Sequence, residues 1–86
     1  MYCGWYPPPM YDYPYVDGPV EIIASAQSVR TFCPPFSQAC MWGGRFHGLK
    51  KCTIFLLEGY SPRSLRHEMA HCNGWPADHP GAIPGC

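Results

Sequence analysis

The sequence predicts a small α+β domain in which a short sheet carries one helix packed across it and disulfides staple the unit together. Three observations favour this fold class: the chain has only 86 residues, it contains six cysteines, and its most apolar strand-like segment is followed by a sharply bounded helical segment. A chain this short forms one domain and buries too small a fraction of its surface for a core alone to stabilise it well. We therefore expect disulfides, a metal ion or both.

Composition excludes several kinds of partner. Six Lys and Arg balance six Asp and Glu, so the formal net charge is zero and no basic patch for nucleic acid or anionic lipid is expected. No apolar run approaches the roughly 20 residues that a membrane-spanning helix needs. A peptide or protein substrate, and a partner chain that completes a cleft, remain compatible with this composition.

The cysteines favour a disulfide framework, because their number is even and the chain is short. The framework in turn predicts a secreted or periplasmic protein, and the alternative is a set of reduced, buried thiols in the cytosol. Residues 1 to 20 show neither a basic segment nor the apolar stretch of a signal peptide, so either that signal is missing from this chain or the compartment prediction is wrong. The six are Cys3, Cys33, Cys40, Cys52, Cys72 and Cys86.

The chain divides into an arm and a domain. Residues 1 to 19 are rich in Pro and Tyr and have no period of 2 or 3.6, which predicts an extended arm that packs aromatic rings on a neighbouring surface. Residues 20 to 86 form the single predicted domain. It begins with a strand over Val20 to Ala24, followed by a short helix capped by Ser25.

Two further strands are expected before the second helix. Residues 39 to 42 form the first of them, and a Gly-rich loop follows. Residues 52 to 57 (CTIFLL) are β-branched, aromatic and apolar on both faces, so this segment should be the central strand of the sheet.

The second helix has clear boundaries in the sequence. Ser61 is an N-cap residue, Pro62 suits the first helical position and Gly74 suits the position just past the end. An apolar stripe then faces the sheet, formed by Leu65, Met69 and Cys72.

This helix carries an HExxH pattern at His67, Glu68 and His71. Residues four apart lie above one another on a helix, so both imidazoles can reach one tetrahedral zinc ion. Glu68 lies beside the metal and can act as the general base that takes a proton from a zinc-activated water. The pattern therefore predicts Zn²⁺ as cofactor, His67 and His71 as ligands and Glu68 as the catalytic residue.

The segment HEMAHCNGWPADH resembles the zincin metallopeptidases, and more narrowly the metzincin-type motif HExxHxxGxxH. His67, Glu68, His71 and Gly74 match that motif position by position, over about 13 of the 86 residues. The resemblance implies a minimal zincin-like protein of bacterial type, with a catalytic helix and a reduced sheet. No Met-turn follows the motif.

The third ligand departs from the motif, which would place a histidine where this chain has Ala77. Asp78 and His79 are the next residues that can bind zinc. We expect His79 to be the ligand, with Pro80 holding it in an extended backbone, because a histidine keeps the ligand type of the motif. Asp78 as the ligand is the alternative.

Other polar residues have simpler explanations. His47 stands in a Gly-rich loop and is expected to be solvated. Cys72 points about 100° away from His71 around the helix and is expected to be either a half-cystine or a core thiol that ties the helix to the sheet. Arg63 and Arg66 lie in the first turns, where the helix dipole disfavours cations, and either contact a partner such as a substrate carboxylate or are simply solvated.

The predicted function is zinc-dependent hydrolysis of peptide bonds. One alternative is a disulfide-stapled structural or binding module with a non-catalytic zinc site, since a domain of this size offers little material for the second wall of a cleft. A structural zinc site is closed by four protein ligands, so Asp78, a cysteine or His47 would have to join the three histidines.

Overall fold

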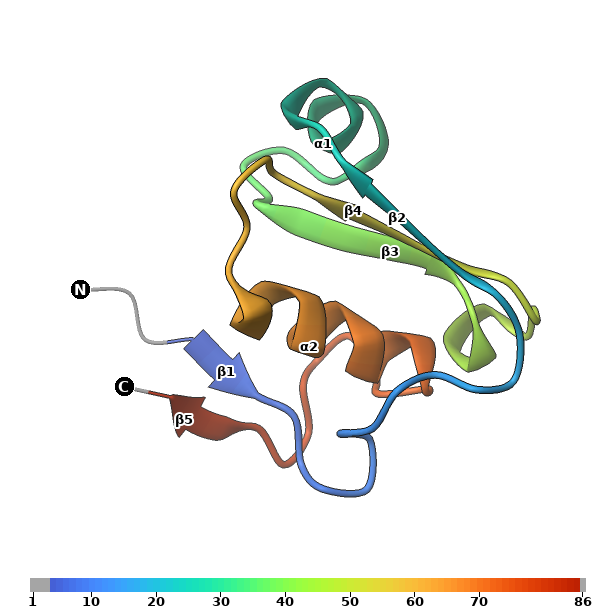
Figure 1. Ribbon diagram of the computed structural model, residues 1–86. Helices are drawn as coiled ribbons and strands as arrows, with labels where there is room; N and C mark the ends of the chain where they lie inside the picture. Colours follow the sequence, from blue (N-terminus) through green and yellow to red (C-terminus); the bar gives the residue numbers. More distant parts are fainter. Residues whose placement is uncertain (1–3, 86) are drawn as a thin grey trace.

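The computed structural model describes residues 4–85 and shows an α+β fold (Figure 1). A three-stranded sheet has the order β2-β4-β3, with β2 parallel and β3 antiparallel to β4, and a separate antiparallel pair joins β1 to β5. Helix α1 covers one face of the larger sheet, helix α2 covers the other, and the β1–β5 pair lies on the far side of α2. The elements are β1 (Gly4–Tyr6), β2 (Val20–Ala24), α1 (Ala26–Phe32), β3 (Ala39–Gly43), the short 3₁₀ helix η1 (Arg45–His47), β4 (Cys52–Leu56), α2 (Pro62–Cys72) and β5 (Ile83–Gly85).

Strand β4 is central, as its apolar sequence predicts. Successive side chains of a strand point to opposite faces. Cys52, Ile54 and Leu56 are fully buried in the cluster that meets α2, whereas Phe55 is buried in a second cluster under α1. Both faces of this strand are therefore covered by a helix.

Helix α1 begins and ends as expected. The Ser25 hydroxyl accepts a hydrogen bond from the Ser28 amide at 3.2 Å. Val29 packs on Phe55, and just past the helix Cys33 forms a disulfide with Cys40 of β3. This bridge closes a loop of sequence separation 7 beside the sheet edge.

Helix α2 has the predicted caps and the predicted apolar stripe. The Ser61 hydroxyl accepts from the Ser64 amide at 3.3 Å, and Pro62 occupies the first turn. Leu65 and Met69 pack on the sheet cluster. Cys72 forms a disulfide with Cys52, which confirms that this cysteine ties the helix to the central strand.

The segment before β2 lies against α2. Tyr15 is buried in the cluster between sheet and helix, and its hydroxyl donates to the carbonyl of Leu49 at 3.2 Å and to that of Lys50. Asn73, at the end of α2, donates to the carbonyls of Tyr11 and Tyr13 at 3.0 and 2.6 Å. Aromatic residues of the predicted arm thus contact the domain.

Two disulfides bear on the location of the protein. The bridges Cys33–Cys40 and Cys52–Cys72 are compatible with an extracellular protein, and the remaining cysteines, Cys3 and Cys86, lie outside the described residues. Within residues 4–85, no helix has the length and apolar character needed to cross a bilayer.

Candidate metal centre

Three histidines converge at the C-terminal half of α2. His67 and His71 stand one turn apart on the helix, and His79 reaches them from the turn that follows. The Nε2 atoms of His67 and His79 are 3.1 Å apart, those of His71 and His79 are 3.2 Å apart, and those of His67 and His71 are 3.3 Å apart. The three nitrogens therefore form a nearly equilateral triangle.

This triangle fits a tetrahedral metal ion. Zinc lies about 2.0–2.1 Å from histidine nitrogens, and at that distance the three separations of 3.1, 3.2 and 3.3 Å subtend angles of about 95–111° at the metal. Tetrahedral angles are about 109°. The three histidines can thus hold a metal ion with little change in the positions of their rings.

A tight turn brings His79 back to the helix. Gly74 has φ 107°, its amide donates to the His71 carbonyl at 3.0 Å, and the Trp75 amide donates to the Ala70 carbonyl at 3.1 Å. This is the Schellman pattern of a helix that ends at a glycine. The chain therefore reverses direction within two residues of the helix end, as the position of Gly74 predicts.

The backbone at His79 differs from the prediction. Its φ is 57°, in the left-handed region, whereas Pro80 suggested an extended conformation. Two consecutive turns explain the difference, because the His79 amide donates to the Pro76 carbonyl at 3.0 Å and the Ala82 amide donates to the His79 carbonyl at 3.2 Å. A left-handed residue other than glycine costs roughly 1–2 kcal/mol, so these turns must hold it in place.

Contacts around His71 fix its tautomer. Its Nδ1–H donates to the Trp75 carbonyl at 2.7 Å, which leaves the lone pair of Nε2 directed at the other two histidines. Burial lowers the pKa of His71 to about 4, although the bond to Trp75 opposes that effect. At neutral pH the ring is therefore uncharged, as a metal ligand must be.

Trp75 supports all three rings and was not identified from the sequence. Its ring centroid lies 4.9 Å from that of His71, 5.2 Å from that of His67 and 4.9 Å from that of His79. It is fully buried, and its Nε1–H donates to the Pro80 carbonyl at 2.8 Å. A large aromatic residue between Gly74 and the third histidine is the feature of the sequence that could have indicated this role.

Glu68 follows the first histidine and faces a cleft. Its side chain is 8% exposed, and burial raises the pKa of its carboxyl group to about 7. The carboxyl group therefore exchanges a proton readily near neutral pH. Glu68 lines the same cleft as His67.

That cleft has a volume of about 750 Å³ and lies along the N-terminal half of α2. Tyr6 of β1 borders it on the side of α2 that faces away from the sheet, and the loop closed by the Cys33–Cys40 bridge, including the fully exposed Phe36, borders it on the sheet side (Figure 1). The N-terminal segment and a disulfide loop thus add lining residues to a cleft that α2 alone could not form. The lining residues are Tyr6, Phe36, Ser37, Gln38, Ala39, Ser61, Pro62, Arg63, Ser64, His67 and Glu68.

Other ligand-type residues stay outside the histidine group. His47 accepts a hydrogen bond at Nδ1 from the Gly43 amide at 3.0 Å, and its ring packs on Trp42. Asp78 is not a member of the group, and Cys72 is bonded to Cys52. Within residues 4–85, the metal-ligating group therefore has three members and no fourth.

No protein-family model, curated protein or solved structure matches this chain at a significant level. Function is therefore inferred from the geometry of the site.

Proposed function

We propose that this chain is a zinc-dependent peptidase of the zincin type, with His67, His71 and His79 as the zinc ligands and Glu68 as the general base. The observation that carries the proposal is the triangle of Nε2 atoms, 3.1–3.3 Å on a side, beside a cleft that also contains Glu68. Three protein ligands are typical of catalytic zinc, and structural zinc has four.

Bound zinc would supply a water of lowered pKa and would polarise the carbonyl of the scissile bond. Glu68 would take a proton from the attacking water as the water oxygen bonds to the carbonyl carbon. The C–N bond then breaks, and Glu68 passes the proton to the departing amine, which leaves a carboxylate on one product and an amine on the other. Burial of Glu68 raises the pKa of its carboxyl group, which favours holding the proton until it passes to the amine.

The chain's own residues prepare this chemistry. The turn at Trp75 and Pro76 holds His71 in the required tautomer and His79 in the required position. The buried Trp75 ring covers one side of the three histidines and excludes water there. The cleft volume of about 750 Å³ leaves room for a short peptide segment beside α2.

The proposal is tested by metal analysis together with a peptidase assay. The purified protein should contain one equivalent of zinc, should cleave an unfolded protein substrate, and should lose that activity to a chelator and regain it when zinc is returned. One equivalent of tightly bound zinc with no cleavage of any substrate would favour the structural module instead.

A further inference from the structure

Besides His67 and Glu68, the cleft contains a charged residue, Arg63, which lies on the same face of α2 as the metal-ligating histidines. It precedes His67 by four residues and lines the cleft together with His67 and Glu68. Residues four apart on a helix are neighbours, with Cβ atoms about 5–6 Å apart. A guanidinium group therefore lies about one helical turn from the metal ligands.

The guanidinium of Arg63 is held in place but not neutralised. It donates to the Tyr6 hydroxyl at 2.9 Å, and its Cζ lies 4.8 Å from the centre of the Tyr6 ring. Within residues 4–85 it forms no ion pair, either with Glu68 or with another acid. Most of its five N–H donors remain available to a ligand.

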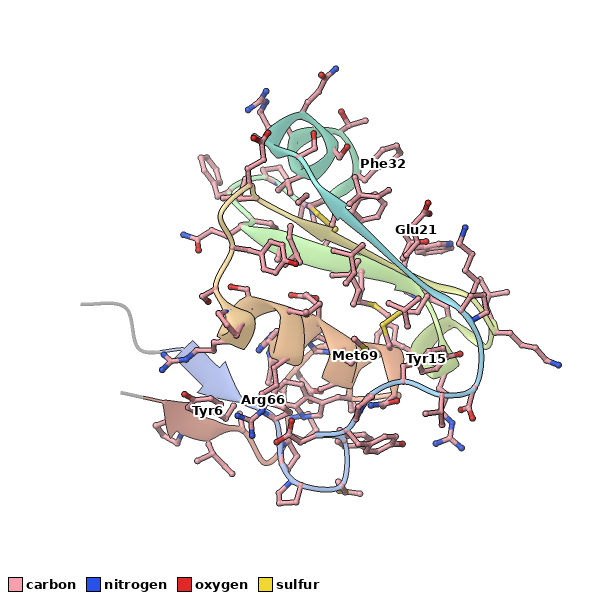
Figure 2. All side chains as sticks on the ribbon, viewed as in Figure 1. Tyr6, Tyr15, Glu21, Phe32, Arg66 and Met69 are labelled. Atoms are coloured by element: carbon pink, nitrogen blue, oxygen red, sulfur yellow. A yellow bond between two sulfur atoms is a disulfide. The ribbon has the colours of Figure 1, made fainter. Side chains whose placement is uncertain are left out.

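Arg66 provides the contrast on the same helix. Its Cζ lies 5.0 Å from the same Tyr6 ring, and both side chains are labelled in Figure 2. Its guanidinium, however, is paired with Asp12 through Nε at 2.8 Å and also through Nη2. Arg66 does not line the cleft. One arginine thus fixes the N-terminal segment to α2, while the other presents an unneutralised charge to the cleft.

We propose that Arg63 binds a carboxylate of the substrate, so that the cleft selects peptides with a negative charge close to the bond that is cut. This inference rests on the peptidase function proposed above. Arginine binds carboxylates through two parallel N–H···O bonds, and its position at the N-terminal end of α2 adds the favourable field of the helix dipole.

The spacing along the helix limits where that carboxylate lies. Four helical residues span about 6 Å, and an extended peptide advances about 3.3–3.6 Å per residue, so the charge sits within about two residues of the scissile bond. Two sources fit: the free C-terminus of a short peptide, or an Asp or Glu side chain near the cut. In the first case the enzyme removes one or two residues from a C-terminus.

Peptide binding distinguishes these sources. The zinc-loaded Glu68→Gln protein, which should bind without turnover, is titrated with one peptide in four forms: free C-terminus, C-terminal amide, amide with Asp at the penultimate position, and amide with Asn there. The two matched comparisons are free C-terminus against amide, and penultimate Asp against penultimate Asn. A carboxylate held by Arg63 should tighten binding by about 10–100-fold in one of them. An effect in the first identifies the C-terminus as the source, and an effect in the second identifies the side chain.

Variants test whether Arg63 is responsible. The ratio of the dissociation constants of the neutral and the carboxylate peptide should fall close to one when Arg63→Gln is added. The control variant Arg30→Gln, which changes an exposed arginine of α1 outside the cleft, should preserve that ratio. A readout that needs no further variant is the Nε–H resonance of Arg63, which should shift with the carboxylate peptide and not with its neutral counterpart. Equal binding of all four peptides, an unmoved resonance, or a ratio that survives Arg63→Gln would overturn the inference.

Failure of the proposed function is recognised separately. Wild-type protein that cleaves acidic and neutral peptides equally well would retain the peptidase function and refute the role of Arg63. A carboxylate preference in binding, with no cleavage by zinc-loaded wild-type protein, would support the role of Arg63 and refute the peptidase function.

Discussion

Removing the Cys52–Cys72 bridge should destabilise the domain more than removing Cys33–Cys40. A disulfide stabilises chiefly by restricting the unfolded chain, and the effect grows with the closed loop. Separations of 20 and 7 residues correspond to about 3.3 and about 2.4 kcal/mol at 25 °C. Chain entropy alone therefore predicts a difference of about 1 kcal/mol between the two double alanine variants.

Packing should widen that difference. Cys52 and Cys72 are both fully buried in the cluster with Ile54 and Leu56, whereas Cys33 is 9% exposed at the edge of the smaller cluster. Replacing Cys52 and Cys72 by alanine leaves a cavity in the larger cluster. That cavity lowers the free energy of unfolding further, beyond the loss caused by removing the bridge. Since small domains have only about 5–15 kcal/mol of stability, the Cys52→Ala/Cys72→Ala protein should be severely weakened.

The measurement is urea denaturation of both double variants and the parent protein, all without metal, with free energies compared only if the m-values agree. Zinc affinity is measured in parallel. Cys72 adjoins His71, so loss of its bridge should also weaken zinc binding. Loss of Cys33–Cys40, which closes a loop that lines the cleft away from the three histidines, should leave zinc binding near that of the parent. Equal destabilisation by the two changes, or the reverse order, would refute this reasoning.

Three further predictions concern the metal centre. Glu68→Gln should retain one equivalent of zinc and the native fold but lose turnover, because an amide cannot accept the proton of water; a zinc-free Glu68→Gln protein would make Glu68 a ligand instead. His79→Ala should release zinc to a competing chelator far more readily than Asp78→Asn, and the opposite order would assign Asp78 as the third ligand. In metal-free Glu68→Gln protein, acidification from pH 6.5 towards pH 5 should lower the free energy of unfolding. The reason is that a histidine of the unfolded chain takes up a proton near pH 6.5, whereas burial lowers the pKa of His71 in the folded chain to about 4. Urea midpoints that are flat across that interval would contradict the buried, neutral state of His71.

The sequence by itself determined the local structure around the site. Ser61, Pro62 and Gly74 predicted the limits of α2, because capping and left-handed turns depend on residues within a few positions of one another. The apolar pattern of residues 52 to 57 predicted the central strand for a similar reason. A strand with apolar side chains on both faces is buried on both faces, and this pattern can be seen within the segment itself. The HExxH spacing predicted that His67 and His71 share a helix face.

Only the tertiary structure decided what surrounds those residues. The partners of Cys33 and Cys72 depend on which strands lie under which helix, and six cysteines allow many pairings. The position of His79 depends on two successive turns that override the preference of a residue before proline. The residues that line the cleft beside α2 include Tyr6 and part of a disulfide loop, both far from α2 in the sequence. Contacts between distant segments are set by the packing of the whole chain, and no short pattern of residues encodes them.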